Sequence, residues 1–259
     1  MSTTITTELV KQLRDATGIS VMQCKKALEE AEGDMDKALA ILKKNSADIA
    51  LKKADREVKA GSINIKSGEE KAVMVSLLCE TDFVAKNEDF VSLLSKLTDK
   101  AFSDGVEKMK EESKEMIDQV IQKTGEKIEL GNVEEIKGNV LGTYTHNAKV
   151  GVVVSLTGGN SDVARDIAMH ITAMKPEYIS ETEIGADARK TMEEIFAKEV
   201  EGVNKPEDIK KKMLEGKIAT YFKEKTLLDQ PFIKNPDKTI RELLKQNNAE
   251  IKEVKRSSV

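Results

Sequence analysis

The first 45 residues carry apolar side chains at the three- and four-residue spacing of short amphipathic helices. Gly18 and Gly33 follow the first two apolar groups, and glycine commonly ends a helix because it adopts the left-handed conformation at little cost. The pattern predicts three short helices, whose apolar faces hold Ile5, Leu9 and Leu13, then Val21, Cys24, Leu28 and Ala31, then Met35, Ala38, Leu39 and Leu42. The lysine-rich residues 43–56 that follow are expected to form a charged, partly helical linker.

Residues 58–176 contain two related halves, and each half reads as a strand hairpin followed by a helix. In the first half, a strand over 62–66 precedes an alternating apolar strand that ends at Cys79. In the second half, a strand over 140–144 precedes a strand over 150–156. Strand hairpins with helices packed on one face predict an α+β fold with small antiparallel sheets and flanking helices.

Two narrow apolar stripes over residues 187–225 predict a pair of antiparallel helices that project into solvent. The second arm starts at Pro206, with Glu207 and Asp208 in its first turn, and all three residue types favour a helix start. Between the two halves, we expect a helix over 106–121 that Gly125 ends, and then a strand over 127–136. We therefore divide the chain into a three-helix domain with its linker (1–55), one core subdomain (56–140) and a second core subdomain (141–259) that carries the hairpin.

The stretch from Cys79 to Asn87 lies on the turn between a strand and a helix, where proteins often place working residues. Asn87 is the expected N-cap of the helix that follows. The stretch sets a carboxylate beside a large apolar ring, Asp82–Phe83, in a chain in which only 3% of residues are aromatic. Spacing alone leaves two interpretations open: Phe83 packs into its own core, or it projects as an anchor for a partner.

Composition and charge limit the classes of function. Charged residues make up 34% of the 259 residues, but the net charge is only −4, which argues against a general electrostatic nucleic-acid binder. Lysine clusters leave a ribosome- or RNA-binding adaptor as an alternative; they are Lys43–Lys44, Lys52–Lys53 and Lys210–Lys211–Lys212. No apolar run approaches the roughly 20 residues that span a bilayer, and the first residues lack the pattern of a secretory signal. We therefore expect a cytoplasmic protein that needs no membrane.

Catalytic chemistry is sparse in this sequence. The thiols of Cys24 and Cys79 lie on apolar faces and are expected to be buried. His170 lies within a helix, next to its apolar face, and is expected to be a packed or capping residue. His146 lies at a hairpin turn and is expected to be exposed. We find no metal-ligand spacing, no phosphate loop and no nucleophile with its base, so we predict no catalytic residue, no metal, no cofactor and no bond-breaking enzyme. A hydrolase that uses Cys79 with His146 or His170 is the weaker alternative.

Two motifs carry a resemblance to a known family. The segment Leu13–Gly18 leading to Cys24–Leu28 resembles the first signature of bacterial elongation factor Ts, and Cys79–Asn87 resembles the second. This family is the nucleotide-exchange factor of the translational GTPase elongation factor Tu. Further similar stretches are Leu141–His146, Met169–His170 with Lys175–Glu177, and Gln230–Phe232, so the resemblance runs from about residue 5 to about residue 250. Ser76, Leu78 and Gln23 depart from the family pattern at positions that flank the motifs.

The resemblance implies a fold and a function. It implies a UBA-like three-helix domain, a two-part core and a protruding helical hairpin, and an exchange factor that binds elongation factor Tu in its GDP-bound and nucleotide-free states without needing nucleic acid. Thr81, Asp82, Phe83 and Val84 are implied to disturb the magnesium and phosphate site of the partner, and Leu13, Arg14 and His146 to add contacts. A dimer of heterodimers is compatible with the family. Longer relatives continue beyond the position where this sequence stops, so a contact from such a segment is not expected here.

Overall fold

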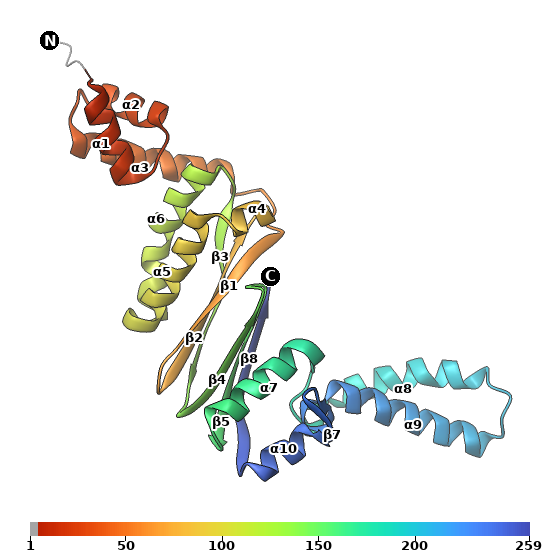
Figure 1. Ribbon diagram of the computed structural model, residues 1–259. Coiled ribbons are helices and arrows are strands. Elements are labelled where there is room, and N and C mark those ends of the chain that lie inside the picture. The colour runs from red at the N-terminus through yellow and green to blue at the C-terminus, as the bar shows by residue number, and fades with distance from the viewer. Residues whose placement is uncertain (1–4) are drawn as a thin grey trace. The chain divides into compact units, whose positions relative to one another are not determined.

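The computed structural model describes residues 5–259 and shows an α+β protein (Figure 1), as predicted. The described residues form ten α-helices, two three-stranded sheets and one two-stranded sheet. The chain divides into two compact units. The first holds the residues up to Ile136 with 145–151 and 257–259, and the second holds 137–144 with 152–256. The division into domains over 1–55, 56–140 and 141–259 stays a prediction.

Three helices begin the first unit: α1 (Thr7–Thr17), α2 (Val21–Glu30) and α3 (Met35–Lys52). The side chain of Thr6 caps α1 by accepting a hydrogen bond from the backbone N–H of Leu9, and Gly18 ends it in the left-handed conformation, with φ of 69°. The apolar faces meet in a core made of Val10, Leu13, Ile19, Cys24, Ala27, Leu28, Ala31, Ala38 and Leu42. The predicted three-helix bundle is therefore confirmed.

The expected linker is largely helical, which corrects the sequence prediction. Helix α3 continues without a break to Lys52, and its second half packs against α6 (Val106–Thr124). The buried Ser46 hydroxyl lies between the two helices and hydrogen-bonds both to the Leu42 carbonyl oxygen and to the Gln122 side chain. Small residues on this face, Ala47 and Ala50 among them, allow the close approach, which the many lysines of this segment obscured in the sequence.

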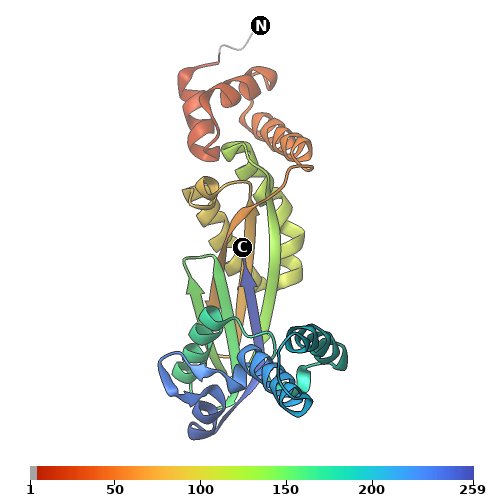
Figure 2. The ribbon, with the colours of Figure 1, turned by 90° about the vertical axis from the view of Figure 1, so that its right-hand side faces the viewer.

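The first sheet has the order β1 (Ala60–Ser67), β2 (Lys71–Cys79) and β3 (Ile128–Lys137). Strands β1 and β2 are antiparallel, paired from Ala60 opposite Cys79 to Ser67 opposite Ala72. Helix α5 (Glu88–Asp104) packs on β1 and β2, and α6 lies beside α5 (Figures 1 and 2). The buried core of this layer includes Val73, Val75, Leu77, Phe90, Leu94, Leu97, Met109 and Ile121. Both strand predictions around residues 62–79, the helix after Asn87 and the strand near 127–136 are confirmed.

The second sheet has the order β4 (Val140–His146), β5 (Val150–Gly158) and β8 (Ala249–Ser258). Helix α7 (Ser161–Met174) begins at the N-cap Asn160 and covers the sheet (Figure 2). The shared core includes Val152, Val154, Leu156, Ala164, Ile167, Ile171 and Ala249. The two strands and the helix expected here are confirmed, whereas β8 was not predicted.

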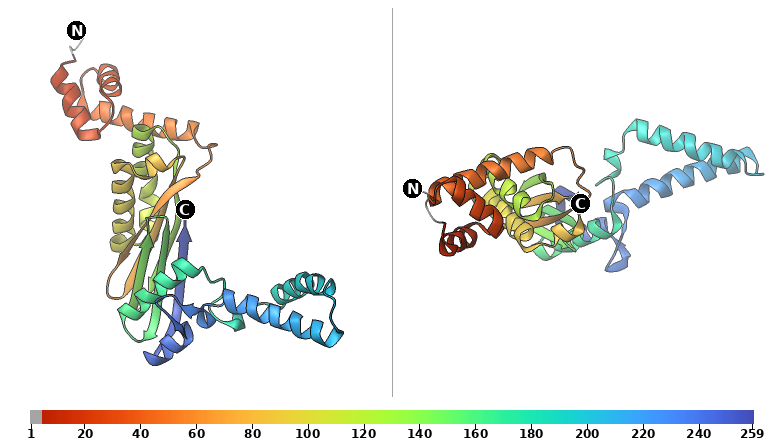
Figure 3. Two further views of the ribbon diagram at one scale, coloured as in Figure 1. Left: turned by 45° about the vertical axis from the view of Figure 1, so that its right-hand side comes forward. Right: turned by 90° about the horizontal axis from the view of Figure 1, so that it is seen from above.

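The helical hairpin consists of α8 (Ala186–Glu201) and α9 (Glu207–Lys225), which contact each other and are joined at the outer tip of the hairpin (Figure 3). Pro206 precedes the first helical residue as the N-cap instead of occupying the first position, a one-residue correction. The sequence did not predict the elements around it, namely the 3-10 turns at 181–183 and 227–229, β6 (Pro231–Phe232), β7 (Asn235–Thr239) and α10 (Ile240–Gln246). Within residues 5–259, none of the helices has the length and apolar character required of a membrane span.

Candidate functional site

The segment after β2 forms a single helical turn, α4 (Asp82–Ala85), which the sequence described only as a turn. Thr81 caps it, because its hydroxyl oxygen accepts a hydrogen bond from the backbone N–H of Val84 at 3.4 Å. The Glu126 carboxylate holds Thr81 in turn, accepting from its backbone N–H at 3.0 Å and from its hydroxyl at 2.6 Å. The start of α4 is thereby fixed to the segment that leads into β3.

The two faces of α4 have opposite surroundings. Val84 and Ala85 are buried in the core of the first unit, and the Ser62 hydroxyl of β1 donates a hydrogen bond to the carbonyl oxygen of Ala85 at 3.2 Å. Phe83 is 88% exposed, the largest exposure of any large apolar side chain described here. Phe83 is therefore not a core residue but a projecting ring on a firmly held turn, and the interpretation of Phe83 as a core residue is wrong.

The tip of the β4–β5 hairpin is a second projecting element of the first unit. Its two central residues, Asn147 and Ala148, have φ of 51° and 55°, which is the left-handed region that two-residue hairpin turns require. The backbone N–H of Lys149 donates to the carbonyl oxygen of His146 at 2.9 Å, and that of Ile63 donates to Ala148 at 2.7 Å. His146 is exposed at this tip, as predicted, and one of its ring nitrogens lies 3.3 Å from the side-chain nitrogen of Asn147.

Lys149 connects the hairpin tip to α4. Its ammonium group forms an ion pair with the Asp82 carboxylate and donates a hydrogen bond to the carbonyl oxygen of Gly61 at 3.0 Å. The hydrogen bond from Lys149 holds the pKa of the Asp82 carboxyl below its usual value. The structure thus places Asp82, at the start of α4, beside the hairpin tip that carries His146, although these two residues are more than sixty residues apart in sequence.

The predicted residues in the N-terminal bundle have different surroundings. Arg14 is exposed on α1, and its side chain is available to a partner. Leu13 is fully buried in the core of the bundle. A side chain with no exposed surface supports the fold instead of contacting a partner, so the direct contact expected of Leu13 is not carried into the proposal below.

The arrangement of the cysteines and histidines argues against a thiol hydrolase. Burial raises the pKa of the Cys79 thiol to about 11, and its sulfur donates to the carbonyl oxygen of Thr81. A thiol with this pKa is almost fully protonated near neutral pH and is a poor nucleophile. His170 is buried with one ring nitrogen bonded to Gln230 at 2.9 Å and the other accepting from the backbone N–H of Ile233 at 3.2 Å. Both nitrogens of His170 are occupied, as expected of a packed histidine.

The structure gives little support for a metal-binding site or a nucleic-acid-binding site. Among residues 5–259, no three side chains of the types His, Cys, Asp and Glu lie close enough together to hold a metal ion. The lysine clusters are partly neutralised within the protein, because Lys43 pairs with Glu115 and Lys210 pairs with Glu207. The ammonium group of Lys53 donates to the carbonyl oxygen of Gly125.

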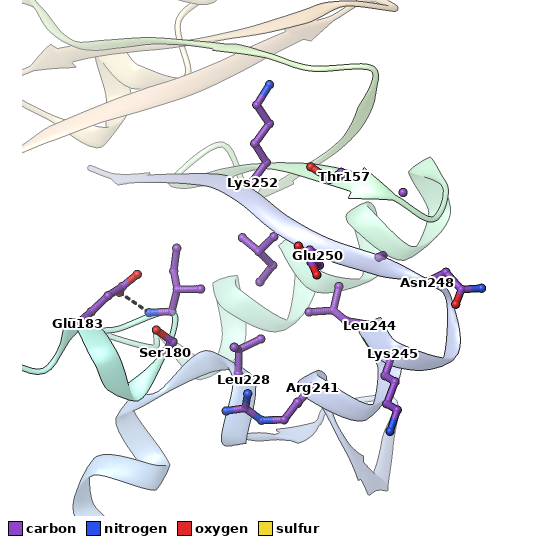
Figure 4. Close-up of a pocket in the computed structure, with 14 residues that line it drawn as sticks. Thr157, Ser180, Glu183, Leu228, Arg241, Leu244, Lys245, Asn248, Glu250 and Lys252 are labelled. Carbon is purple, nitrogen blue, oxygen red and sulfur yellow. Dashed lines mark hydrogen bonds between the residues drawn. The ribbon is translucent and has the colours of Figure 1, made fainter.

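The second unit contains a cavity of about 950 Å³ beside α10 and β8 (Figure 4). Ten of its fourteen lining residues are Thr157, Ser180, Glu183, Leu228, Arg241, Leu244, Lys245, Asn248, Glu250 and Lys252. Its cations do not converge, since the side chains of Lys245 and Lys252 extend in opposite directions (Figure 4) and Arg241 pairs with Asp229 at 2.7 Å. The lining has mixed charges, so it offers no focused binding site for an anion, and it has no histidine to act as a base for the hydroxyls of Thr157 and Ser180.

Sequence reasoning missed the residues that hold the site together: Lys149, Glu126, Ser62 and Gly61. Glu126 and Lys149 lie 45 and 67 residues from their partners in α4, so no local pattern connects them. The one available signal was the position of Lys149 directly after the predicted hairpin turn, which places its side chain near the tip.

Comparisons with known proteins find similarity to one family. The model of the family described as elongation factor TS matches residues 80–259. The elongation factor Ts of Idiomarina loihiensis is 38% identical over 259 residues, covering 95% of this chain and 88% of the relative. The elongation factor Ts of Cellvibrio japonicus is 37% identical, covering 98% and 90%, and that of Thioalkalivibrio sulfidiphilus is 36% identical, covering 99% and 92%.

Proposed function

The chain belongs to the elongation factor Ts family, and from that premise we propose that it is a guanine-nucleotide exchange factor that acts on elongation factor Tu during translation. In this proposal it binds the GDP-bound GTPase, accelerates the release of GDP and remains bound to the nucleotide-free state until GTP enters. The protein breaks no covalent bond and needs no cofactor or metal of its own. We place the reaction in the cytoplasm.

The exposure of Phe83 is the observation that carries the proposal. An aromatic ring that is 88% exposed on a capped helical turn is costly to leave in water and is well suited to fill an apolar pocket of a partner. The turn that carries the ring is already ordered before binding, because Thr81 and Ala85 are tied to the rest of the unit. Phe83 is therefore the anchor whose insertion distorts the partner near its magnesium and phosphate site.

Exchange follows from reciprocity of binding. If the factor binds nucleotide-free elongation factor Tu more tightly than the GDP-bound form, GDP binding must be weakened by the same ratio. Only Asp82 and Phe83 of the four-residue segment face solvent, whereas Thr81 and Val84 hold the turn in place. We assign the direct contact to Asp82 and Phe83, with His146 as a second wedge on the same surface.

The N-terminal bundle is assigned the role of a docking domain. Arg14 is exposed on its first helix and provides the charged contact. The bundle thus adds affinity, while α4 and the hairpin tip disturb the nucleotide site. A complex of two molecules of this protein with two molecules of elongation factor Tu also fits the proposal.

The direct experiment measures GDP release from purified elongation factor Tu loaded with a fluorescent GDP analogue. Added at increasing concentration, the protein is expected to raise the release rate to a plateau, with half-saturation at the affinity of the complex. No acceleration at any concentration, together with salt-sensitive binding to RNA without a GTPase, would overturn the proposal in favour of the RNA-binding adaptor.

A further inference from the structure

The ammonium group of Lys149 joins three segments of the first unit that are distant in sequence. It donates to the carbonyl oxygen of Gly61 on β1 at 3.0 Å and pairs with Asp82 on α4, while the backbone of Lys149 closes the turn that carries His146. Its side chain is 33% exposed, so much of its length packs against protein, whereas the Asp82 side chain is 64% exposed. A half-buried cation with fixed acceptors is a better structural tie than a fully solvated ion pair.

The hairpin tip that Lys149 closes is also the least relaxed backbone in this region. Asn147 and Ala148 both have positive φ, and Ala148 has a side chain that disfavours this conformation. Such a turn persists only where its surroundings hold it. The hydrogen bond from the Ile63 N–H to the Ala148 carbonyl holds one side, and the Lys149 side chain anchored on Gly61 and Asp82 holds the other.

We propose that Lys149 is the positioning residue of the exchange site, which fixes Phe83 and His146 relative to each other so that they meet the partner as one rigid surface. This inference rests on the proposed exchange function. Phe83 follows Asp82 directly, so fixing the Asp82 side chain helps to fix the backbone turn from which the neighbouring ring projects. Lys149 itself acts through Asp82 and Gly61 and not by touching the partner.

Removing the Lys149 ammonium group is expected to uncouple α4 from the hairpin tip. Without the ammonium group, α4 keeps its cap at Thr81 and its buried residue Val84, and the hairpin keeps its strand pairing, but the two elements move independently. Misplacement of working groups lowers rates steeply, so Lys149→Met is expected to slow stimulated GDP release about tenfold. Lys149→Arg preserves a cation and donors and is expected to stay within about threefold of the wild type.

The test combines hydrogen exchange of the free protein with release kinetics. Lys149→Met should speed amide exchange in residues 81–86 and 145–151 and leave the rest of the chain unchanged. The control is Lys66→Met, which breaks a comparable ion pair with Asp99 at the other end of β1. This control variant should change amide exchange in neither segment. Faster exchange spread over the whole first unit would show a general loss of stability and would overturn the proposal. Unchanged exchange in both segments would also overturn it.

A double-mutant cycle with Asp82→Ala supplies the kinetic readout. If Lys149 acts through Asp82, Lys149→Met should slow release far less in the Asp82→Ala background than in the wild type. Equal slowing in both backgrounds would show that the tie between Lys149 and Asp82 contributes nothing and would overturn the positioning role. Hydrogen exchange is measured on the protein without the GTPase. If the proposed nucleotide-exchange function is wrong, this failure is seen separately, because the wild type then does not stimulate GDP release.

Discussion

At the scale of single residues, burial and exposure separate groups that support the site from groups that present it. Thr81 and Val84 look equivalent to Asp82 and Phe83 in the sequence, yet the first two are a cap and a core residue and the second two face solvent. One helical turn is enough for this division, since successive side chains point in different directions around its axis.

The thiol of Cys79 gives a prediction for the pH dependence of stability. Burial raises its pKa to about 11, above the value of about 8.5 for a thiol in an unfolded chain. The unfolded state therefore loses the proton first as pH rises, and the contribution of Cys79 to stability is complete below the unfolded pKa and is lost progressively above it.

Chemical denaturation of the wild type and Cys79→Ala between about pH 7 and pH 10 measures this effect. The variant is expected to be less stable at neutral pH, because it leaves a small cavity, and to show a flatter decline at alkaline pH. Parallel declines in the two proteins would show that Cys79 titrates alike in the folded and unfolded states.

At the scale of elements, glycine allows close contact between β4 and α7. A Cβ atom on Gly142 would lie 2.1 Å from the backbone of Ala164 and Arg165, so the helix would have to move. Gly142→Ala is expected to lower the free energy of unfolding by roughly 1–3 kcal/mol, the usual cost of overpacking. Gly216 on α9 has open space around its Cβ position and serves as the matched control.

Thermal and denaturant unfolding decide between steric clash and a general effect of alanine. Gly216→Ala should stabilise the protein slightly, by about 0.5–1 kcal/mol, because alanine favours the helix. A Gly142→Ala protein as stable as the wild type would show that β4 and α7 do not approach as closely as described.

The elements that the sequence predicted share a strong local signal. The three-helix bundle and the two halves made of a strand hairpin and a helix have clear periodicity and capping residues, such as Gly18 after α1 and Asn87 before α5. The elements it missed have little local signal. Strand β6 has only two residues, and β8 consists mostly of charged and polar residues without a regular alternation.

The same distinction applies to the site. The exposure of the hairpin histidine was predictable because it belongs to a turn that the local pattern defines. Spacing alone left the placement of Phe83 open, and only the structure shows that its ring is exposed. The ties to Glu126 and Lys149 were not predictable, because they depend on tertiary contacts between distant segments. The second half of α3 was misread as a linker for a related reason: its packing face consists of small residues, and only the position of α6 shows that this face is buried.

At the scale of the whole molecule, we expect the N-terminal bundle to be separable from the site. Deletion of residues 1–45 removes α1, α2 and the first half of α3 but keeps Ser46, whose hydroxyl bonds to Gln122 on α6. The remainder should fold, as judged by circular dichroism and a single cooperative transition, and bind elongation factor Tu at least about tenfold more weakly. Unchanged affinity would remove the docking role from the bundle.

The central claim is that the exposed ring of Phe83 drives exchange, and one measurement tests it most directly. Release of a fluorescent GDP analogue from elongation factor Tu is followed with the wild type, Phe83→Ala and Leu51→Ala, the last removing an apolar side chain that is 70% exposed on α3. The account predicts that Phe83→Ala unfolds at the wild-type temperature but stimulates release roughly thirtyfold less, a loss of about 2 kcal/mol typical of an interface anchor. Leu51→Ala should match the wild type. A Phe83→Ala protein that stimulates release as well as the wild type would contradict the account.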